Sequence, residues 1–304
     1  MRSLGKRFFL SALAVALLLT PVSSAKALRV AIQILSTPQK TMKSDVIVVG
    51  KVAEIEKDLV QAVPYPKAPT KSEYQVAVIK ISDALQGAKG LSQIRVGWVV
   101  RTPNVVNPST DAPRLKIRPP FVQMEVTLQA DQEGVFFLKK HPEADFYVMV
   151  PNSQPLDKKA ENFDKELGNV KNIIKVVAKP LDALKAEKSA DRQLAAAVLL
   201  SKYGTYPEIT DPTAQPKQEP INDEESKLIL KALTEMEWAN GGEDQFTSLG
   251  AVFYMLGLNE KDGWKQPAFN GQGDFNKLMK DSFDKWAKEN GDKFRVKQWV
   301  VGKK

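Results

Sequence analysis

The sequence of 304 residues contains no cysteine and a single histidine, His141. Without cysteine the chain can form no disulfide, no thiol nucleophile and no cysteine-ligated metal site. Ordinary metal sites use two or three imidazole or thiolate ligands, so we predict no metal and no cofactor. We expect His141, which stands beside Pro142, at the surface. No serine lies in a Gly-x-Ser-x-Gly turn, which argues against a catalytic triad.

Only the first residues contain a long hydrophobic run. Arg2, Lys6 and Arg7 precede the uncharged run 8–19, and Ala25-Lys26-Ala27 follows it. This order is typical of a secretory signal peptide, cleaved after Ala27 or, as a variant, after Ala25. The competing interpretation is a membrane anchor, but the run of 12 residues is shorter than the roughly 20 that a spanning helix needs. We predict an exported protein, periplasmic or extracellular, with no membrane span after cleavage.

The positive charge is modest and dispersed. The formal net charge of +8 includes four basic residues within positions 1–27, so the rest of the chain is near +4. The remaining lysines alternate with acidic residues, which is typical of solvated surfaces. Nucleic-acid binding usually requires a concentrated basic stripe, so we predict no nucleic-acid partner.

After a lead-in at residues 28–44, positions 45–152 have the two-residue periodicity of strands. The expected strands are 45–52, 74–81, 94–100, 122–128, 135–138 and 146–150. Gly50 in the first strand indicates a bend or bulge, and a slip of the alternation at Ile79-Lys80-Ile81 fits either a bulge or a strand covered on both faces. Short turns and the absence of a helical period predict a small antiparallel barrel or sandwich.

From residue 153 to 304 the hydrophobic period becomes helical. The expected helices are 161–179, 189–204, 223–238, 246–256 and 274–289, with a proline-rich linker at 210–221 and a strand or ordered tail at 295–301. The predicted fold class is therefore α+β: an OB-like barrel domain at 45–152, followed by an all-helical domain at 153–304.

A family resemblance supports the barrel. The segments DVIVVGKVAEIE (45–56), YQVAVIK (74–80), LQGAKGLSQIRVG (85–97) and EGVFFLKK (133–140) resemble the netrin-like modules that include tissue inhibitors of metalloproteinases. The likeness covers about residues 45–150 and implies a five-stranded OB-type barrel with a binding role. Those inhibitors act through an N-terminal cysteine, which this chain lacks, so the resemblance implies no functional residue here.

The segment 101–120 is the favoured binding candidate. It carries five prolines and the basic residues Arg101, Arg114, Lys116 and Arg118, with Asp111 as its one acid. Long loops on a rigid β scaffold commonly bind ligands, and guanidinium groups suit carboxylate or phosphate. The alternative is a solvated, variable loop.

Other candidates have ordinary structural interpretations. Trp264, in the glycine-rich connector 259–274, is either a ligand contact or a plug of the helical core. That connector lacks the spacing of a calcium loop. Ser282-x-x-Lys285 matches a serine–lysine motif but lies inside an amphipathic helix without its companion motifs. Acidic residues at 223–225 are explained by the preference of helix N-termini for acids.

The sequence therefore favours an exported, non-catalytic binding protein with a protein or anionic ligand as partner. One alternative is an envelope hydrolase that acts on glycans or esters through dispersed carboxylates, since two acids on opposite sides of a bond suffice. A structural or assembly component is another.

Overall fold

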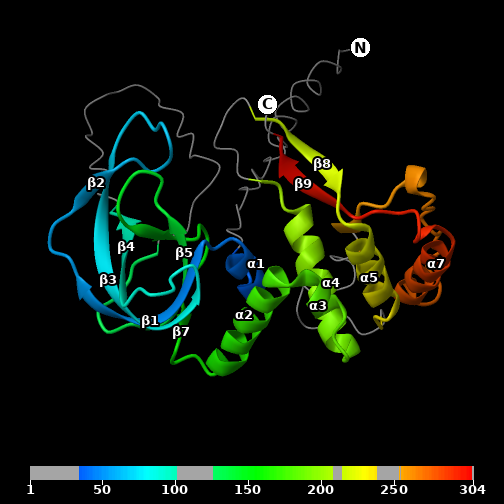
Figure 1. Cartoon of the computed structure of the whole chain (residues 1–304), viewed down its shortest axis with the longest axis horizontal. Coiled ribbons are helices and arrows are strands. Elements are labelled where there is room, and N and C mark those ends of the chain that lie inside the picture. The colour runs from blue at the N-terminus through cyan, green and yellow to red at the C-terminus, as the bar shows by residue number, and fades with distance from the viewer. Residues whose placement is uncertain (1–33, 101–125, 208–213, 238–252, 254, 303–304) are drawn as a thin grey trace, which may run out of the picture.

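The computed structural model describes residues 34–100, 126–207, 214–237, 253 and 255–302. The chain is α+β, with a closed five-stranded barrel in its N-terminal half and most of its helices in the second half (Figure 1). The predicted signal peptide, residues 1–27, lies outside the described residues. Within the described part of the chain, no helix combines the length and the hydropathy needed to cross a bilayer.

Five strands close the barrel: β1 (Val46–Ile55), β3 (Ser72–Gln86), β4 (Gln93–Val99), β6 (Tyr147–Met149) and β5 (Glu133–Lys140), which pairs back to β1. All of these pairs are antiparallel except β4–β6, which is parallel. The short strands β2 (Val60–Ala62) and β7 (Leu156–Asp157) pair with β3 and β5. Residues 126–128, expected in a strand, form none, and the rest of that prediction lies outside the described residues.

The predicted bulge lies beside Gly50. Gly50 pairs with Ile81 while Val49 pairs with Asp83, so the ladder shifts by one residue there. A Cβ atom at position 50 would lie 2.5 Å from the carbonyl oxygen of Lys80, so only glycine permits this close approach. The bulge that the slipped alternation predicts is thus confirmed.

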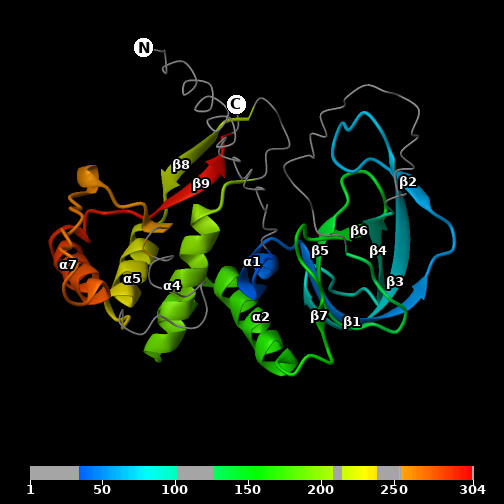
Figure 2. The same ribbon diagram turned by 180° about the vertical axis from the view of Figure 1, so that it is seen from behind.

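Strands β1 and β5 are covered on both faces, which explains their unbroken apolar runs. Val48 and Phe136 point into the barrel, whereas Ile47 and Phe137 pack outside it against helix α2 (Phe163–Ala178). A short helix, α1 (Thr37–Met42), lies within the predicted lead-in and contacts α2. These two helices lie between the barrel and the second half in both opposite views (Figures 1 and 2).

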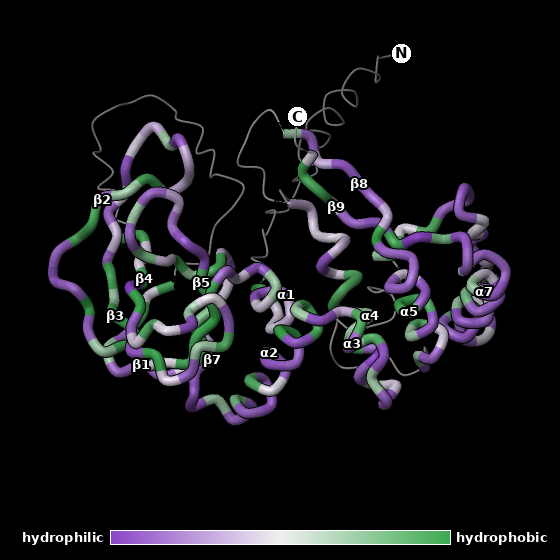
Figure 3. Tube along the Cα trace, viewed as in Figure 1, coloured by the Kyte–Doolittle hydropathy of each residue, from purple (hydrophilic) through white to green (hydrophobic). Residues whose placement is uncertain are grey.

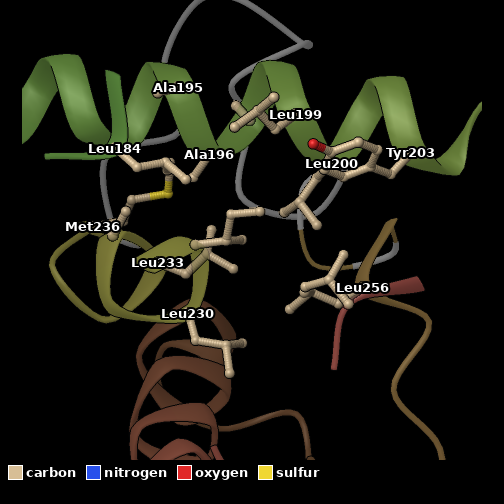
Figure 4. Close-up of a cluster of buried hydrophobic side chains, with 14 of the residues drawn as sticks. Leu184, Ala195, Ala196, Leu199, Leu200, Tyr203, Leu230, Leu233, Met236 and Leu256 are labelled. Carbon is tan, nitrogen blue, oxygen red and sulfur yellow. The ribbon is translucent and has the colours of Figure 1, made fainter. Parts of the chain in front are cut away.

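The second half is built around α4 (Ser189–Gly204), in which every residue from Ala195 to Leu200 is buried. Around it lie α3 (Pro180–Leu184), α5 (Asp223–Thr234), a 3₁₀ turn η1 (Glu260–Asp262) and α7 (Phe275–Asn290). In Figure 4, Ala196 and Leu200 of α4 lie across from Leu233 and Met236 at the end of α5. Most of the expected helix 246–256 lies outside the described residues.

Two details correct the prediction of an all-helical half. Strands β8 (Pro216–Pro220) and β9 (Lys297–Val301) form a two-stranded antiparallel sheet, and β8 occupies part of the segment that we expected to be a linker. Proline is tolerated in β8 because one edge of this strand has no strand partner. Figure 3 shows hydrophobic stretches along the barrel strands and a largely hydrophilic α7, as expected for a surface helix.

Candidate functional site

A cavity of about 240 Å³ lies where β4 and β6 run side by side. The loop before β3 contributes Pro64, and the loop that joins β5 to β6 contributes His141 and Pro142. Val126 follows the undescribed segment 101–125, and the other lining residues come from the strands and their ends: Tyr74, Gly97, Trp98, Val99, Val148, Met149, Val150, Pro151 and Asn152. The wall is therefore made mainly of aromatic, proline and aliphatic side chains.

Gly97 makes room for the aromatic cluster beside the cavity. A Cβ atom at this position would lie 2.6 Å from the Phe146 ring, so the ring packs directly on the strand backbone. Phe146 contacts Tyr74 and His141 at ring-centroid distances of 5.1 and 4.7 Å, and Tyr74 meets His141 edge-on at 5.4 Å. The cluster holds the histidine and tyrosine rings in fixed positions against the sheet.

The prediction that His141 lies at the surface is wrong. Its side chain is only 2% exposed, because the loop turns inward to place the ring between Tyr74 and Phe146. Its Nδ1 atom accepts hydrogen bonds from the backbone N–H groups of Glu143 (3.2 Å) and Ala144 (2.9 Å). Since Nδ1 is an acceptor, the neutral ring carries its hydrogen on Nε2.

The Nε2 atom of His141 is buried and makes no hydrogen bond to the described residues. A buried donor without an acceptor costs about 1–3 kcal/mol, so such an atom calls for a partner. Burial lowers the pKa of His141, and the Val63 carbonyl and Glu143 only partly oppose this. The Val63 backbone therefore lies close enough to interact with the ring, although the contact falls outside strict hydrogen-bond geometry. His141 is therefore a neutral donor near pH 7.

Tyr74 and Trp98 also line the cavity, and Tyr74 is only 3% exposed. Burial raises the pKa of Tyr74, so the phenol remains protonated. None of the described lining residues carries a formal charge at neutral pH. The cavity therefore has a mainly apolar, uncharged wall with a few polar side chains, a composition typical of ligand sites.

Carboxylate or metal chemistry has no support at this site. None of the described lining residues is an acid, and the described residues contain no group of three potential metal ligands. The converging pair of acids that the hydrolase alternative requires is not among the described residues of this wall.

Of the predicted site residues, Arg101, Arg114, Lys116 and Arg118 lie outside the described residues. Their loop nevertheless leaves and re-enters the described chain at the cavity, because Val99 and Val126 both line it. The residues that flank the predicted loop thus line the cavity, while the cavity's own residues were not predicted. Nothing in the local pattern around His141 distinguishes a buried ring from an exposed one.

The remaining candidates have structural roles. Trp264 is 5% exposed and packs on Phe253 and Trp286 in the helical core, so it is a plug rather than a ligand contact. The Ser282 hydroxyl donates to the Leu278 carbonyl within α7. In the connector, Asn259 hydrogen-bonds Asp262 and caps η1, which uses both side chains in local structure.

No protein-family model matches the chain. No curated protein matches its sequence either. The geometry of the cavity is therefore the basis for the function proposed below.

One further perturbed group lies away from the cavity. Lys40 of α1 is 8% exposed, its ammonium lies 4.5 Å from the centroid of the Phe137 ring, and burial lowers its pKa. The ammonium also lies 3.5 Å from the Gln154 carbonyl oxygen. These contacts attach α1 to the outside of the barrel, which is a structural role.

Proposed function

We propose that this protein is a non-catalytic binding protein whose barrel is of the OB type and holds a ligand in the cavity at His141. The observation that carries the proposal is the cavity of about 240 Å³, whose described wall is mainly apolar and carries no formal charge. A concave apolar pocket with a few polar side chains is the usual form of a ligand site. The neutral wall of the cavity favours an uncharged ligand over the anionic one that the basic loop predicted.

The topology supports the OB assignment. The closed order β1-β3-β4-β6-β5-β1, with its one parallel pair, is the arrangement expected for the five-stranded barrel that the netrin-like resemblance implies. OB barrels bind their ligands on the face of the second and third strands, between the loops that follow the first and fourth strands. In this chain those elements are β3, β4 and the loops at 56–71 and 141–146. All four contribute to the cavity, and β3 does so through Tyr74.

Export is part of the same proposal and rests on the N-terminal pattern. Its test is the mass of the protein recovered after expression with the full N-terminus. We expect a chain that begins at Leu28, or at Lys26 for the variant cut. Recovery of the chain with residues 1–27 still attached would contradict export by cleavage.

Tryptophan side-chain NMR tests the binding site directly. The chain contains five tryptophans, so five indole N–H signals can be assigned by single substitutions. We would titrate the ¹⁵N-labelled protein with three uncharged probes: indole, chitotriose and decaproline. We expect at least one probe to shift the Trp98 signal in a saturable way.

Trp264 and Trp286 provide internal controls for this titration. Both are buried in the helical core, and the Trp286 indole N–H donates to the Asp262 carbonyl at 2.8 Å. Their signals should stay in place when Trp98 responds. If no probe shifts the Trp98 signal, or if all five signals shift together, the cavity is not the binding site and the proposal fails.

A further inference from the structure

We infer that the aromatic pair Phe269 and Phe275 docks the protein on the surface of an anionic lipid bilayer. Phe275 begins α7, which lies at the end of the molecule opposite the barrel in both views (Figures 1 and 2). The inference goes beyond the proposed function and does not depend on the cavity. It follows from the exposure of the two rings, the charge around them and the small apolar area that they offer.

Both rings are exposed to solvent although they are large and apolar. Phe269, in the connector 259–274, is 43% exposed, and Phe275 is 42% exposed. Their ring centroids lie 5.3 Å apart in an edge-on contact. Among the described residues, no other two exposed aromatic side chains contact each other. The two rings therefore form a single apolar patch.

The backbone between the rings stands clear of the described protein. Every residue in the stretch 268–277 is exposed. Gly271 and Gly273 adopt left-handed conformations, with φ of 81° and 85°, and no heavy atom lies within 4 Å of the position of an added Cβ at either glycine. The turn can therefore approach a flat surface without a clash from the rest of the described chain.

The charge around the patch is positive. The segment 263–280 contains Lys265, Lys277 and Lys280 and a single acid, Asp274. The Asp274 carboxylate accepts two hydrogen bonds from backbone N–H groups in the first turn of α7, so it serves as the helix cap. Lys265 and Lys277 are exposed and form no ion pair with the described residues. These two ammonium groups are complementary to anionic lipid headgroups.

The apolar area is too small for a stable protein interface. A buried aromatic side chain covers about 150–250 Å², so two rings that are each about two-fifths exposed offer roughly 150–200 Å². A stable interface buries about 800 Å² on each partner. A bilayer requires no matching surface, because a few apolar side chains enter the headgroup region while nearby cations attract anionic lipids. The patch therefore fits a lipid surface, bound weakly and reversibly, better than a second copy of this chain.

Co-sedimentation with lipid vesicles tests this inference. The chain that begins at Leu28 is used, because the hydrophobic run 8–19 would itself bind lipid. We expect it to sediment with vesicles of phosphatidylglycerol and phosphatidylcholine in equal parts, and to bind phosphatidylcholine alone about tenfold more weakly. The double variant Phe269→Ala/Phe275→Ala should bind the mixed vesicles about tenfold more weakly or worse, because it removes the inserted apolar surface. Lys277→Gln should weaken this binding about fivefold, the usual contribution of one lysine near an anionic surface.

The double variant Leu59→Ala/Leu91→Ala is the matched control. These side chains are 43% and 47% exposed and belong to the barrel half, so the change removes two exposed apolar side chains elsewhere. It should bind the mixed vesicles as the parent chain does, and circular dichroism establishes that every variant is folded.

Three results overturn the inference. The first is a parent chain that does not sediment with the mixed vesicles. The second is a phenylalanine double variant that binds them as well as the parent, or no worse than the leucine double variant. The third is self-association in sedimentation velocity that the phenylalanine double variant loses, without vesicle binding, since the rings would then form an interface between copies. None of these results bears on the cavity, so the proposed function stands or falls by the tryptophan titration.

Discussion

The molecule contains two aromatic clusters that differ in how their polar atoms are satisfied. In the second half, Trp286 packs against Phe283, Trp264 and Phe294, and its indole N–H donates to a backbone carbonyl. In the barrel, Tyr74 and His141 pack with Phe146, yet the buried Nε2 of His141 has no acceptor among the described residues. Ring packing alone therefore does not identify a site, and what distinguishes the barrel cluster is the cavity of about 240 Å³ beside it.

The largest effect on stability is expected from removing one ring from the aromatic cluster of the second half. Phe283 is fully buried, so Phe283→Ala should lower the free energy of unfolding by about 3–5 kcal/mol, because it removes buried surface and leaves a cavity. Chemical denaturation measures this loss. In the barrel, Trp98→Ala should cost less, since Trp98 is only half-buried, and it should weaken probe binding as followed by the backbone amide signals of the barrel. Equal losses in the two variants would contradict the distinction between a core and a site.

A second prediction concerns the space beside Phe146. Gly97→Ala places a methyl group 2.6 Å from the Phe146 ring, so the ring must move, and overpacking of this kind costs about 1–3 kcal/mol. The displaced ring should also weaken probe binding at the cavity. Gly168→Ala is the control, because this helical glycine has no heavy atom within 4 Å of the added carbon. It should raise stability by up to about 1 kcal/mol, so the two alanine variants should differ in sign.

The periodic spacing of hydrophobic residues predicted much of the fold, because buried and exposed positions alternate regularly along each strand and helix. The apolar runs of β1 and β5 are a local consequence of burial on both faces, and Asp274 caps α7 through its own neighbours. The cavity was not predictable in this way. His141, Tyr74 and Trp98 come from three elements, and only the closure of the barrel brings them together. A strand or ordered tail was expected at 295–301, but β8 was missed for a similar reason, since it is a proline-bounded polar segment stabilised by a partner about 80 residues away.

A third prediction uses the fact that His141 is the only histidine. Burial holds its folded pKa below the ordinary value of 6.5, so the unfolded chain takes up a proton first as the pH falls. The stability from the neutral ring is therefore present above about pH 6.5 and is lost as the pH falls from there through the folded pKa. Unfolding free energies measured between pH 7.5 and 5 should show this loss.

His141→Asn is the matching variant for the pH series. The asparagine side-chain oxygen can accept from the N–H groups of Glu143 and Ala144, as Nδ1 does, but it does not titrate. The part of the pH dependence between 7 and 5.5 should become flatter in this variant. An unchanged slope would show that carboxylates cause the dependence and that His141 is not held neutral by its surroundings.

The smallest effect is expected at the tyrosine hydroxyls, where the two halves of the molecule should again differ. The Tyr203 hydroxyl donates to a Glu225 carboxylate oxygen, and burial and this hydrogen bond raise the pKa of Tyr203. Tyr203→Phe should therefore lower the free energy of unfolding by about 1–2 kcal/mol, because it leaves a charged acceptor without its donor. Tyr74→Phe removes a hydroxyl that makes no hydrogen bond to the described residues, so stability should change by less than about 0.5 kcal/mol. Denaturation of the two variants under one set of conditions gives the comparison. A loss at Tyr74 as large as that at Tyr203 would mean that the Tyr74 hydroxyl already has a partner within the chain, and it would then not be free for a ligand.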